Sequence, residues 1–182
     1  MRDIYISPIK AVLHCTDDPA LDFILCTSED YLSKPLPSNV LRLDFRDTVD
    51  VDDPAAFSAQ LAADVASFLQ RPDARPELFV CCDCGVSRSV ALAAAIRCAD
   101  GGSDFSIWDD PNYMPNPLVY RLTRRVLNAP ITEDALNDRL ALNATARRKA
   151  FSKKVTQTGA VEAKMPNGCR KISGKPNVTA TL

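Results

Sequence analysis

The chain has 182 residues, 46% of them hydrophobic, and its 22 basic and 23 acidic residues give a formal net charge of −1. This length allows one medium-sized domain with an appendage, and the composition is that of a soluble globular protein. No stretch is long and apolar enough for a secretory signal or a membrane span, so we expect a cytoplasmic protein without membrane association.

Seven cysteines occur along the chain. Their number is odd and they are scattered, which excludes the disulfide scaffold of a small secreted protein. Cys81, Cys82 and Cys84 lie close together in the sequence. This clustering favours thiols that are kept reduced in the cytoplasm.

The first 45 residues contain three short apolar runs typical of β-strands. Residues 3–7 form the first run, and residues 22–27 form a continuous run of the kind that is buried on both faces of a sheet. Residues 40–45 alternate more between apolar and polar, so we expect this strand nearer a sheet edge. A helical turn at residues 9–14 and a loop at residues 28–39 separate the three strands.

An acidic loop at residues 46–53 follows the third strand. Asp53 and Pro54 together are a helix start signal, because a carboxylate can cap a helix and proline fits its first turn. We therefore expect a helix over residues 54–70, with one apolar face formed by residues three and four positions apart.

The most informative stretch is a strand, a loop and a helix in direct succession. Residues 78–82 form a continuous apolar run typical of a buried strand, and residues 90–96 are apolar and Ala-rich, as in a buried helix. The loop between them runs from Cys82 to Ser89 and contains Gly85. Such a loop directs backbone N–H groups and a helix N-terminus at one spot, so we expect an anion-binding site there.

Strands and helices alternate along this part of the chain, and a further helix is predicted over residues 117–127. The fold class that we expect is α/β, with three layers and a mainly parallel central sheet flanked by helices. Ligands of such sheets bind beyond the carboxyl ends of the strands, where the Cys82 loop would lie.

By this pattern the chain divides into three parts. Residues 1–130 carry the alternating elements and form one domain, and residues 131–155 carry a thin apolar stripe that predicts a C-terminal helix. Residues 156–182 have no aromatic residue and little periodicity, so we expect a disordered tail. From Arg147 onward nine basic residues stand against one acid, Glu162. This basic region either keeps the protein soluble or binds nucleic acid or an acidic partner.

The loop residues have a particular spacing, with Gly85 three residues after Cys82, Arg88 six and Ser89 seven. Between a buried strand and a buried helix, this spacing resembles the Cys-x5-Arg-Ser/Thr signature of the cysteine-dependent protein tyrosine and dual-specificity phosphatase superfamily. No Trp-Pro-Asp motif is present, so the resemblance is to the compact dual-specificity-like branch. It covers residues 3–127.

The resemblance implies a phosphatase that hydrolyses phosphate monoesters of phosphotyrosine, and also of phosphoserine or phosphothreonine, through a phospho-cysteine intermediate. Cys82 would be the nucleophile, Arg88 would bind phosphate and Ser89 would stabilise the departing thiolate. The other phosphate-binding loop residues would be Asp83, Cys84, Gly85, Val86 and Ser87. No metal or organic cofactor is implied, and the partner would be a phosphorylated protein or a small phosphate ester.

The general acid of such phosphatases lies in a loop one helix before the cysteine strand. The acidic loop at residues 46–53 has this place in the chain, and Asp47 is our first choice for the acid. Asp50 is the alternative, because the last two aspartates of the loop are better placed for capping. By analogy alone, Asn116 and Tyr120 would belong to a supporting loop.

Two residues depart from the family pattern. Cys81 stands where the family usually has histidine, which affects the expected rate more than the expected fold. Asp83 follows the nucleophile directly, and a carboxylate that faced inward would oppose ionisation of the thiol. We therefore expect Asp83 to face substrate or solvent. The loop has no lysine and no second arginine, so it is a poor match to polyanionic inositol phosphates.

Other interpretations of the loop stay open. A catalytically weak pseudophosphatase would bind phosphorylated partners, and a sulfurtransferase or arsenate-reductase-like enzyme would also place a cysteine in an anion-binding loop. Either Cys81 or Cys84 is a candidate to trap oxidised Cys82 as a disulfide. A zinc site formed by Cys81, Cys82, Cys84 and Cys98 has the wrong spacing for a zinc knuckle. The oligomeric state is not predicted.

Overall fold

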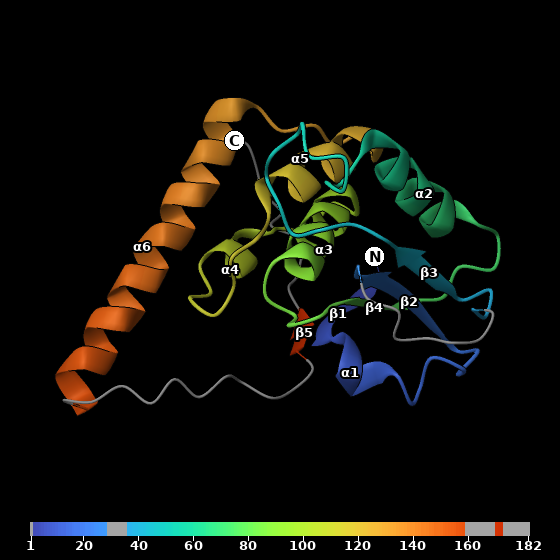
Figure 1. The fold of residues 1–182 in the computed structure, drawn as a ribbon, viewed down its shortest axis with the longest axis horizontal. Coiled ribbons are helices and arrows are strands. Elements are labelled where there is room, and N and C mark those ends of the chain that lie inside the picture. Colours follow the sequence, from blue (N-terminus) through green and yellow to red (C-terminus); the bar gives the residue numbers. More distant parts are fainter. Residues whose placement is uncertain (1, 29–35, 159–169, 173–182) are drawn as a thin grey trace, which may run out of the picture.

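The computed structural model describes residues 2–28, 36–158 and 170–172. Within these ranges the chain forms the strands and helices labelled in Figure 1. In chain order they are β1 (Asp3–Pro8), α1 (Ile9–Val12), β2 (Leu21–Cys26), β3 (Val40–Leu43), α2 (Ala59–Gln70), β4 (Glu77–Cys82), α3 (Arg88–Ala99), α4 (Phe105–Trp108), α5 (Pro117–Val126), α6 (Glu133–Thr158) and β5 (Arg170–Ile172).

The described strands form one sheet in the order β3-β2-β4-β1-β5. The first four strands of this order are parallel to one another, and β5 pairs antiparallel with β1. The mainly parallel sheet predicted from the sequence is therefore confirmed, as is the edge position of β3. Because β4 lies between β2 and β1, its carboxyl end meets the carboxyl ends of both neighbours.

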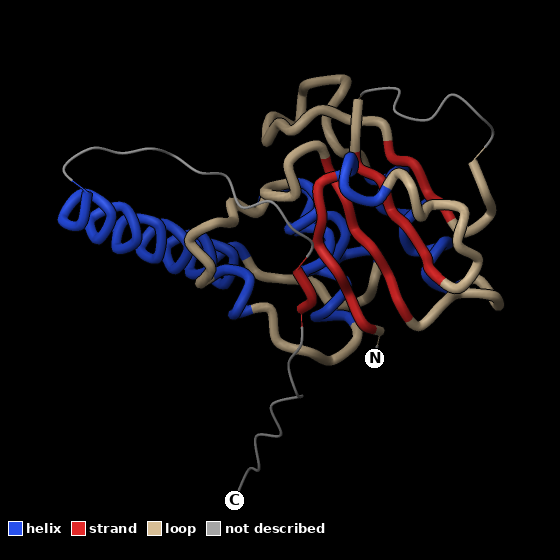
Figure 2. The backbone as a smooth tube through the Cα atoms, turned by 90° about the horizontal axis from the view of Figure 1, so that it is seen from below, coloured by secondary structure: helices blue, strands red, loops and turns tan. Residues whose placement is uncertain are grey.

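Helices cover both faces of the sheet, with α2, α3 and α5 on one side and the short α1 on the other (Figure 1). Figure 2 shows the strands from below. The larger hydrophobic cluster joins one face of the strands to α2, α3 and α5, and a smaller one joins the opposite face to α1. Burying an aliphatic side chain in such a core contributes about 1.5–3 kcal/mol. The three-layer α/β arrangement follows from this two-sided burial.

Helix α3 is the central helix of the larger cluster, and residues 88–97 are all buried. Its run of alanines allows close approach to the sheet and to α5, as the sequence predicts for a helix that is apolar all round. The helix begins at Arg88, two residues before the predicted start. Arg88 and Ser89 therefore lie in its first turn.

The predicted start of α2 is wrong. The helix begins at Ala59, not at Pro54, and the hydroxyl of Ser58 caps it by accepting a bond from the Leu61 N–H at 3.3 Å. Asp53 caps only a local turn, where it accepts from the Ala55 N–H at 2.9 Å. The segment before α2 is instead fixed by Phe57, which is 2% exposed and packs with the core.

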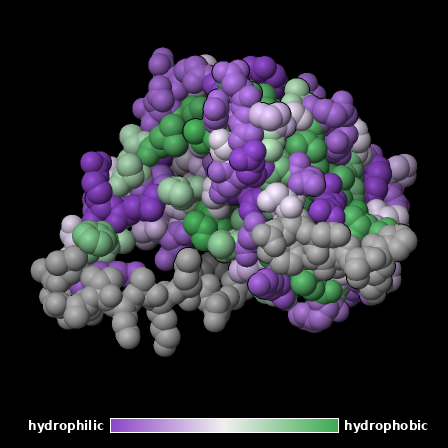
Figure 3. Space-filling view, viewed as in Figure 1, coloured by the Kyte–Doolittle hydropathy of each residue, from purple (hydrophilic) through white to green (hydrophobic). Residues whose placement is uncertain are grey.

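Helix α6 confirms the predicted C-terminal helix and extends away from the sheet (Figure 1). Its first half is tied to the domain by Arg139, which pairs with Asp104, and by Asn143, which donates to backbone carbonyls of the α4–α5 segment. No helix in the described part of the chain is long and apolar enough to cross a membrane. Figure 3 shows polar residues over much of the face seen in Figure 1, with hydrophobic residues in smaller patches between them.

The predicted disordered tail is corrected at two places. Residues 156–158 belong to α6, and Arg170–Ile172 form β5 against β1. The sequence has no periodicity there, but the outer edge of β1 offers unpaired backbone groups that a short strand can satisfy. The rest of the tail lies outside the described residues, with Lys164 and Lys175 of the predicted basic region.

Candidate active site

The loop from β4 to α3 forms a tight turn at the carboxyl edge of the sheet. Cys82 is the last residue of β4, in register with Cys26 of β2 and Pro8 of β1. Gly85 has a φ of +67°, and a Cβ there would lie 2.9 Å from the Pro8 backbone nitrogen. The turn therefore requires glycine both for its backbone conformation and for its close approach to β1.

Backbone donors of this loop are unpaired. Within the described ranges, no residue accepts a hydrogen bond from the N–H groups of residues 83–87. Ser87 is at the N-cap position of α3, but its side chain makes no capping bond to the helix. Uncapped N–H groups at a helix N-terminus attract an anion through hydrogen bonds and the helix dipole. The predicted anion site thus has the donors it needs.

The sulfur of Cys82 lies 3.1 Å from the hydroxyl oxygen of Ser89. Both side chains are buried, with Cys82 2% exposed and Ser89 0% exposed. A hydroxyl at this distance can donate to a thiolate and stabilise its charge, so the structure brings together the two residues that the signature pairs.

Arg88 is buried at the same loop, with 6% of its surface exposed. Its Nη1 donates to the carbonyl of Phe45 at 3.0 Å, and its Nη2 donates to the carboxylate of Asp83. Its Nε is buried and has no hydrogen-bond partner in the described structure. Burial lowers the pKa of Arg88, but the hydrogen bond and charge of Asp83 raise it above its ordinary value, so the guanidinium stays cationic.

As expected, the Asp83 side chain is partly exposed, at 27%, but protein groups also bind its carboxylate. Its carboxylate accepts a bond from the Thr27 hydroxyl at 2.9 Å and pairs with Arg88. Thr27 follows β2 directly and is 56 residues away in sequence. Sequence reasoning missed Thr27 because only the pairing of β2 with β4 brings the two residues together.

Within the described ranges Asp47 contacts the Cys82 loop, whereas Asp50 does not. One carboxylate oxygen of Asp47 accepts from the Ser87 hydroxyl at 3.0 Å and from the Asn116 amide at 2.8 Å. Asp50 accepts from the backbone N–H of Asp52, and within the described ranges it makes no hydrogen bond to residues 83–89. The structure therefore places the first choice for the acid, and not its alternative, at the Cys82 loop.

The segment before α5 forms a third side of the site. Asn116 caps α5 through bonds from the Leu118 and Val119 N–H groups, and the backbone N–H of Met114 donates to the Val86 carbonyl at 2.9 Å. The supporting role given to Asn116 by analogy thus has a structural basis. Tyr120 does not share it, because its hydroxyl donates to Asp104, away from the Cys82 loop.

The other cysteines differ in their relation to Cys82. Cys81 is buried in the smaller core on the opposite face, and Cys84 is exposed. Cys26, which the sequence analysis did not single out, lies beside Cys82 on the neighbouring strand, and burial followed by the charge of Cys82 raises its pKa well above the ordinary value. No group of three or more His, Cys, Asp or Glu in the described ranges could hold a metal ion.

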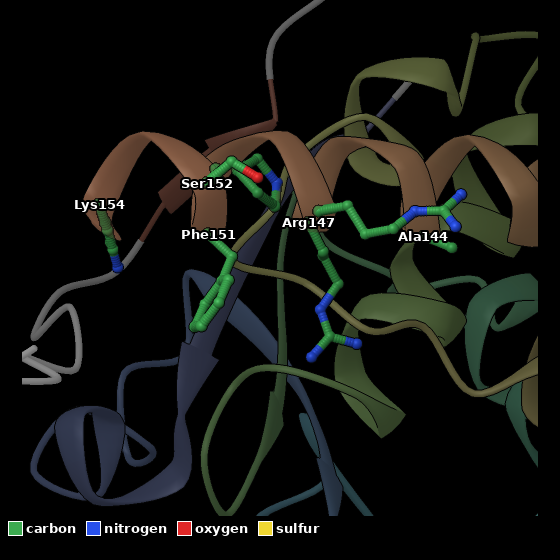
Figure 4. A pocket seen from close by; sticks show the side chains of 8 residues that line it. Ala144, Arg147, Phe151, Ser152 and Lys154 are labelled. Atoms are coloured by element: carbon green, nitrogen blue, oxygen red, sulfur yellow. The ribbon is translucent and has the colours of Figure 1, made fainter. Parts of the chain in front are cut away.

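A separate cavity of about 680 Å³ lies beside the C-terminal half of α6 (Figure 4). It is lined by Pro111, Ala144, Arg147, Arg148, Ala150, Phe151, Ser152 and Lys154. The first basic residues of the C-terminal region therefore surround a hollow. It contains none of the residues of the Cys82 loop.

No protein-family model, curated protein or solved structure matches this chain. Its chemistry therefore has to follow from the site itself. That site combines a buried thiol beside a hydroxyl, unpaired backbone donors, a buried arginine with an unpaired nitrogen, and an aspartate held at the mouth of the loop.

Proposed function

We propose that the protein is a phosphatase that hydrolyses phosphate monoesters through a phospho-cysteine intermediate, of the compact dual-specificity-like kind. The observation that carries this proposal is the position of Cys82, whose sulfur lies beside Ser89 at the start of α3, next to unpaired N–H donors and the Arg88 guanidinium. A helix N-terminus and a nearby cation favour the thiolate form of a cysteine, and the same donors bind a phosphoryl group.

In the first step the Cys82 sulfur attacks phosphorus, and the bond from phosphorus to the ester oxygen breaks. Asp47 gives its proton to that oxygen, so the leaving group departs as a neutral alcohol or phenol. The oxygen of Asp47 that accepts from Ser87 and Asn116 orients the carboxyl group. Within the described structure the other oxygen accepts no hydrogen bond, so it is available to carry the proton.

In the second step water attacks the phospho-cysteine, and Asp47 takes a proton from that water. The sulfur–phosphorus bond breaks, inorganic phosphate is released and the Cys82 thiolate returns. The Ser89 hydroxyl donates to this thiolate as it forms. The scheme uses only residues of the chain, and its substrates are phosphotyrosine, phosphoserine or phosphothreonine of proteins, or small phosphate esters.

One assay tests the proposal: hydrolysis of a small aryl phosphate by the wild type, by Cys82→Ser and by Asp47→Asn. We expect Cys82→Ser to lose activity and Asp47→Asn to lose at least about tenfold in kcat, since general acid catalysis typically contributes more than that. Asp50→Asn is the matched control, because it removes the same charge from the same loop, and we expect it to keep its activity. Activity that survives in Cys82→Ser would overturn the covalent mechanism.

Two observations favour a second function, a phospho-binding module with little turnover. Arg88 is already paired with Asp83, and Cys81 replaces the histidine expected beside the nucleophile. Orthovanadate binding measured by titration calorimetry distinguishes the two functions. Binding without any turnover of the aryl phosphate would favour the module, and binding with turnover supports the phosphatase.

A further inference from the structure

The pair formed by Asp83 and Arg88 has a consequence for the ligand that the site accepts. We infer that Asp83 is an internal competitor that a substrate phosphate displaces from Arg88. The site then favours phosphate esters whose neighbouring groups are neutral or cationic. This inference rests on the proposed function, because it concerns the same phosphate site.

The hydrogen-bond donors of Arg88 show where phosphate can bind. Arginine holds a phosphate best through two parallel N–H groups on one edge of its guanidinium. The edge that carries Nε has an unpaired donor. The other nitrogen of that edge is Nη2, which has two N–H groups and donates one of them to the Asp83 carboxylate. Two anions at one nitrogen repel each other, so a phosphate that binds this edge displaces the carboxylate.

Arg88 does not depend on Asp83 for its position. Its Nη1 is held by the Phe45 carbonyl at 3.0 Å, and its guanidinium carbon lies 5.8 Å from the centre of the Phe45 ring. The side chain is surrounded by the core on its remaining sides, at 8% exposure. These contacts keep the guanidinium in place when its Nη2 partner leaves, which makes Asp83 a competitor for Arg88 and not its support.

Asp83 itself is free to move aside. Its side chain is 27% exposed at the mouth of the loop, and apart from Arg88 its described hydrogen-bond partner is the Thr27 hydroxyl. A carboxylate that leaves Arg88 regains water without passing through the core. Its displacement therefore needs no rearrangement of β4 or α3.

The displaced carboxylate decides which substrates are accepted. It remains beside the bound phosphate as a negative charge, because Asp83 directly follows Cys82 in the chain. The Asp83 carboxylate repels a negative group next to the bound phosphate and attracts a positive group there. The substrate class that fits is a phosphorylated segment with a lysine or arginine next to the phosphorylated residue, and polyanions are disfavoured.

The first test measures orthovanadate binding to the wild type and to Asp83→Asn by titration calorimetry. Asparagine has the same shape and can still accept from Thr27, but it lacks the charge that holds Arg88. We expect Asp83→Asn to bind vanadate about tenfold more tightly, because hydrogen-bonded charge pairs are commonly worth that factor. Asp44→Asn is the control: Asp44 is an exposed acid that pairs with Arg42, and its loss should leave the affinity unchanged.

The second test compares kcat/KM for two phosphotyrosine peptides that differ only in a lysine or a glutamate beside the phosphotyrosine. The wild type should have the higher kcat/KM for the lysine peptide. In Asp83→Asn the ratio of kcat/KM for the lysine peptide to that for the glutamate peptide should be closer to one. Weaker vanadate binding by Asp83→Asn with an unchanged peptide ratio would overturn the inference and show that Asp83 positions Arg88. If the wild type binds vanadate but hydrolyses nothing, the proposed function fails, and the vanadate comparison still decides whether Asp83 competes.

Discussion

Two arginine–aspartate pairs of this protein are built differently. Asp104 is 1% exposed and accepts bonds from Trp108 and Tyr120 as well as from two nitrogens of Arg139. Asp83 is partly exposed, and among the described residues it binds the Thr27 hydroxyl in addition to Arg88. Arg139 lies on α6 and joins it to the domain, whereas Arg88 lies in the first turn of α3 and keeps an unpaired Nε.

The difference separates a structural pair from one suited to a ligand. Every described polar atom of the Asp104 carboxylate has protein donors, so the pair is complete without a ligand and removing one partner leaves a buried group unpaired. In the pair of Asp83 and Arg88, the carboxylate is partly exposed to water, and the Arg88 Nε has no hydrogen-bond partner in the described structure. An unpaired buried donor is costly, and a bound anion relieves that cost.

The largest expected effect is a loss of activity when Arg88 is replaced by lysine. Arg88→Lys keeps a positive charge but loses the planar edge that binds phosphate through two donors. We expect kcat/KM for an aryl phosphate to fall about a thousandfold, the scale seen when a transition-state donor is removed, measured on the folded variant so that any loss of stability is kept apart. Arg139→Lys is the matched control and should show the reverse: near-normal kcat/KM with reduced stability. Equal losses of activity in both variants would contradict the distinction between the pairs.

The next largest effect is expected at the structural pair. Asp104→Asn removes the charge that Arg139 needs, and breaking a buried ion pair on one side costs about 3 kcal/mol of unfolding free energy. Urea unfolding of the full chain measures this loss. Activity of the folded variant should be close to that of the wild type, because none of the described contacts of Asp104 involves the Cys82 loop. A stable but inactive Asp104→Asn would mean that the two regions are coupled.

The smallest effect is a pH dependence. Burial raises the pKa of Asp104, but the bonds from Arg139, Tyr120 and Trp108 outweigh it and hold that pKa below its ordinary value. As the pH falls, the unfolded chain takes up this proton first, at about pH 4, so the stabilisation is complete above that pH and is lost as the pH falls through the folded-state pKa. The stability difference between wild type and Asp104→Asn should therefore shrink from pH 6 to pH 3. A difference that stays constant would show that charge is not what stabilises the pair.

The sequence predicted the parts of this structure that depend on local pattern. The β4 run, the glycine of the loop and the buried α3 are adjacent in the chain, so their geometry followed from residues 78–96 alone. Asp47 was chosen because the resemblance puts the general acid in the loop one helix before the cysteine strand, and in the structure Asp47 contacts the Cys82 loop through Ser87. What failed depends on contacts distant in sequence. The sequence did not predict that Thr27 and Arg88 bind Asp83, nor that β5 pairs with the open edge of β1.

The prediction of where α2 begins was wrong for a different reason. Asp53 and Ser58 are both capable caps, and local pattern cannot decide between them. Burial of Phe57 against Phe45, whose ring centres lie 4.8 Å apart, fixes the chain before the helix and so selects Ser58. The packing of Phe57 against Phe45 could not be predicted from the local sequence around either residue.

The central claim is that Cys82 carries the phosphoryl group during turnover. The most direct measurement is mass spectrometry of the wild-type protein quenched in acid while it hydrolyses an aryl phosphate, followed by digestion and analysis of the peptide that contains Cys82. We predict that this peptide gains the mass of one phosphoryl group on the Cys82 sulfur and that Cys82→Ser gains none under the same conditions. Steady turnover with the phosphoryl group on another residue, or on none, would contradict the account.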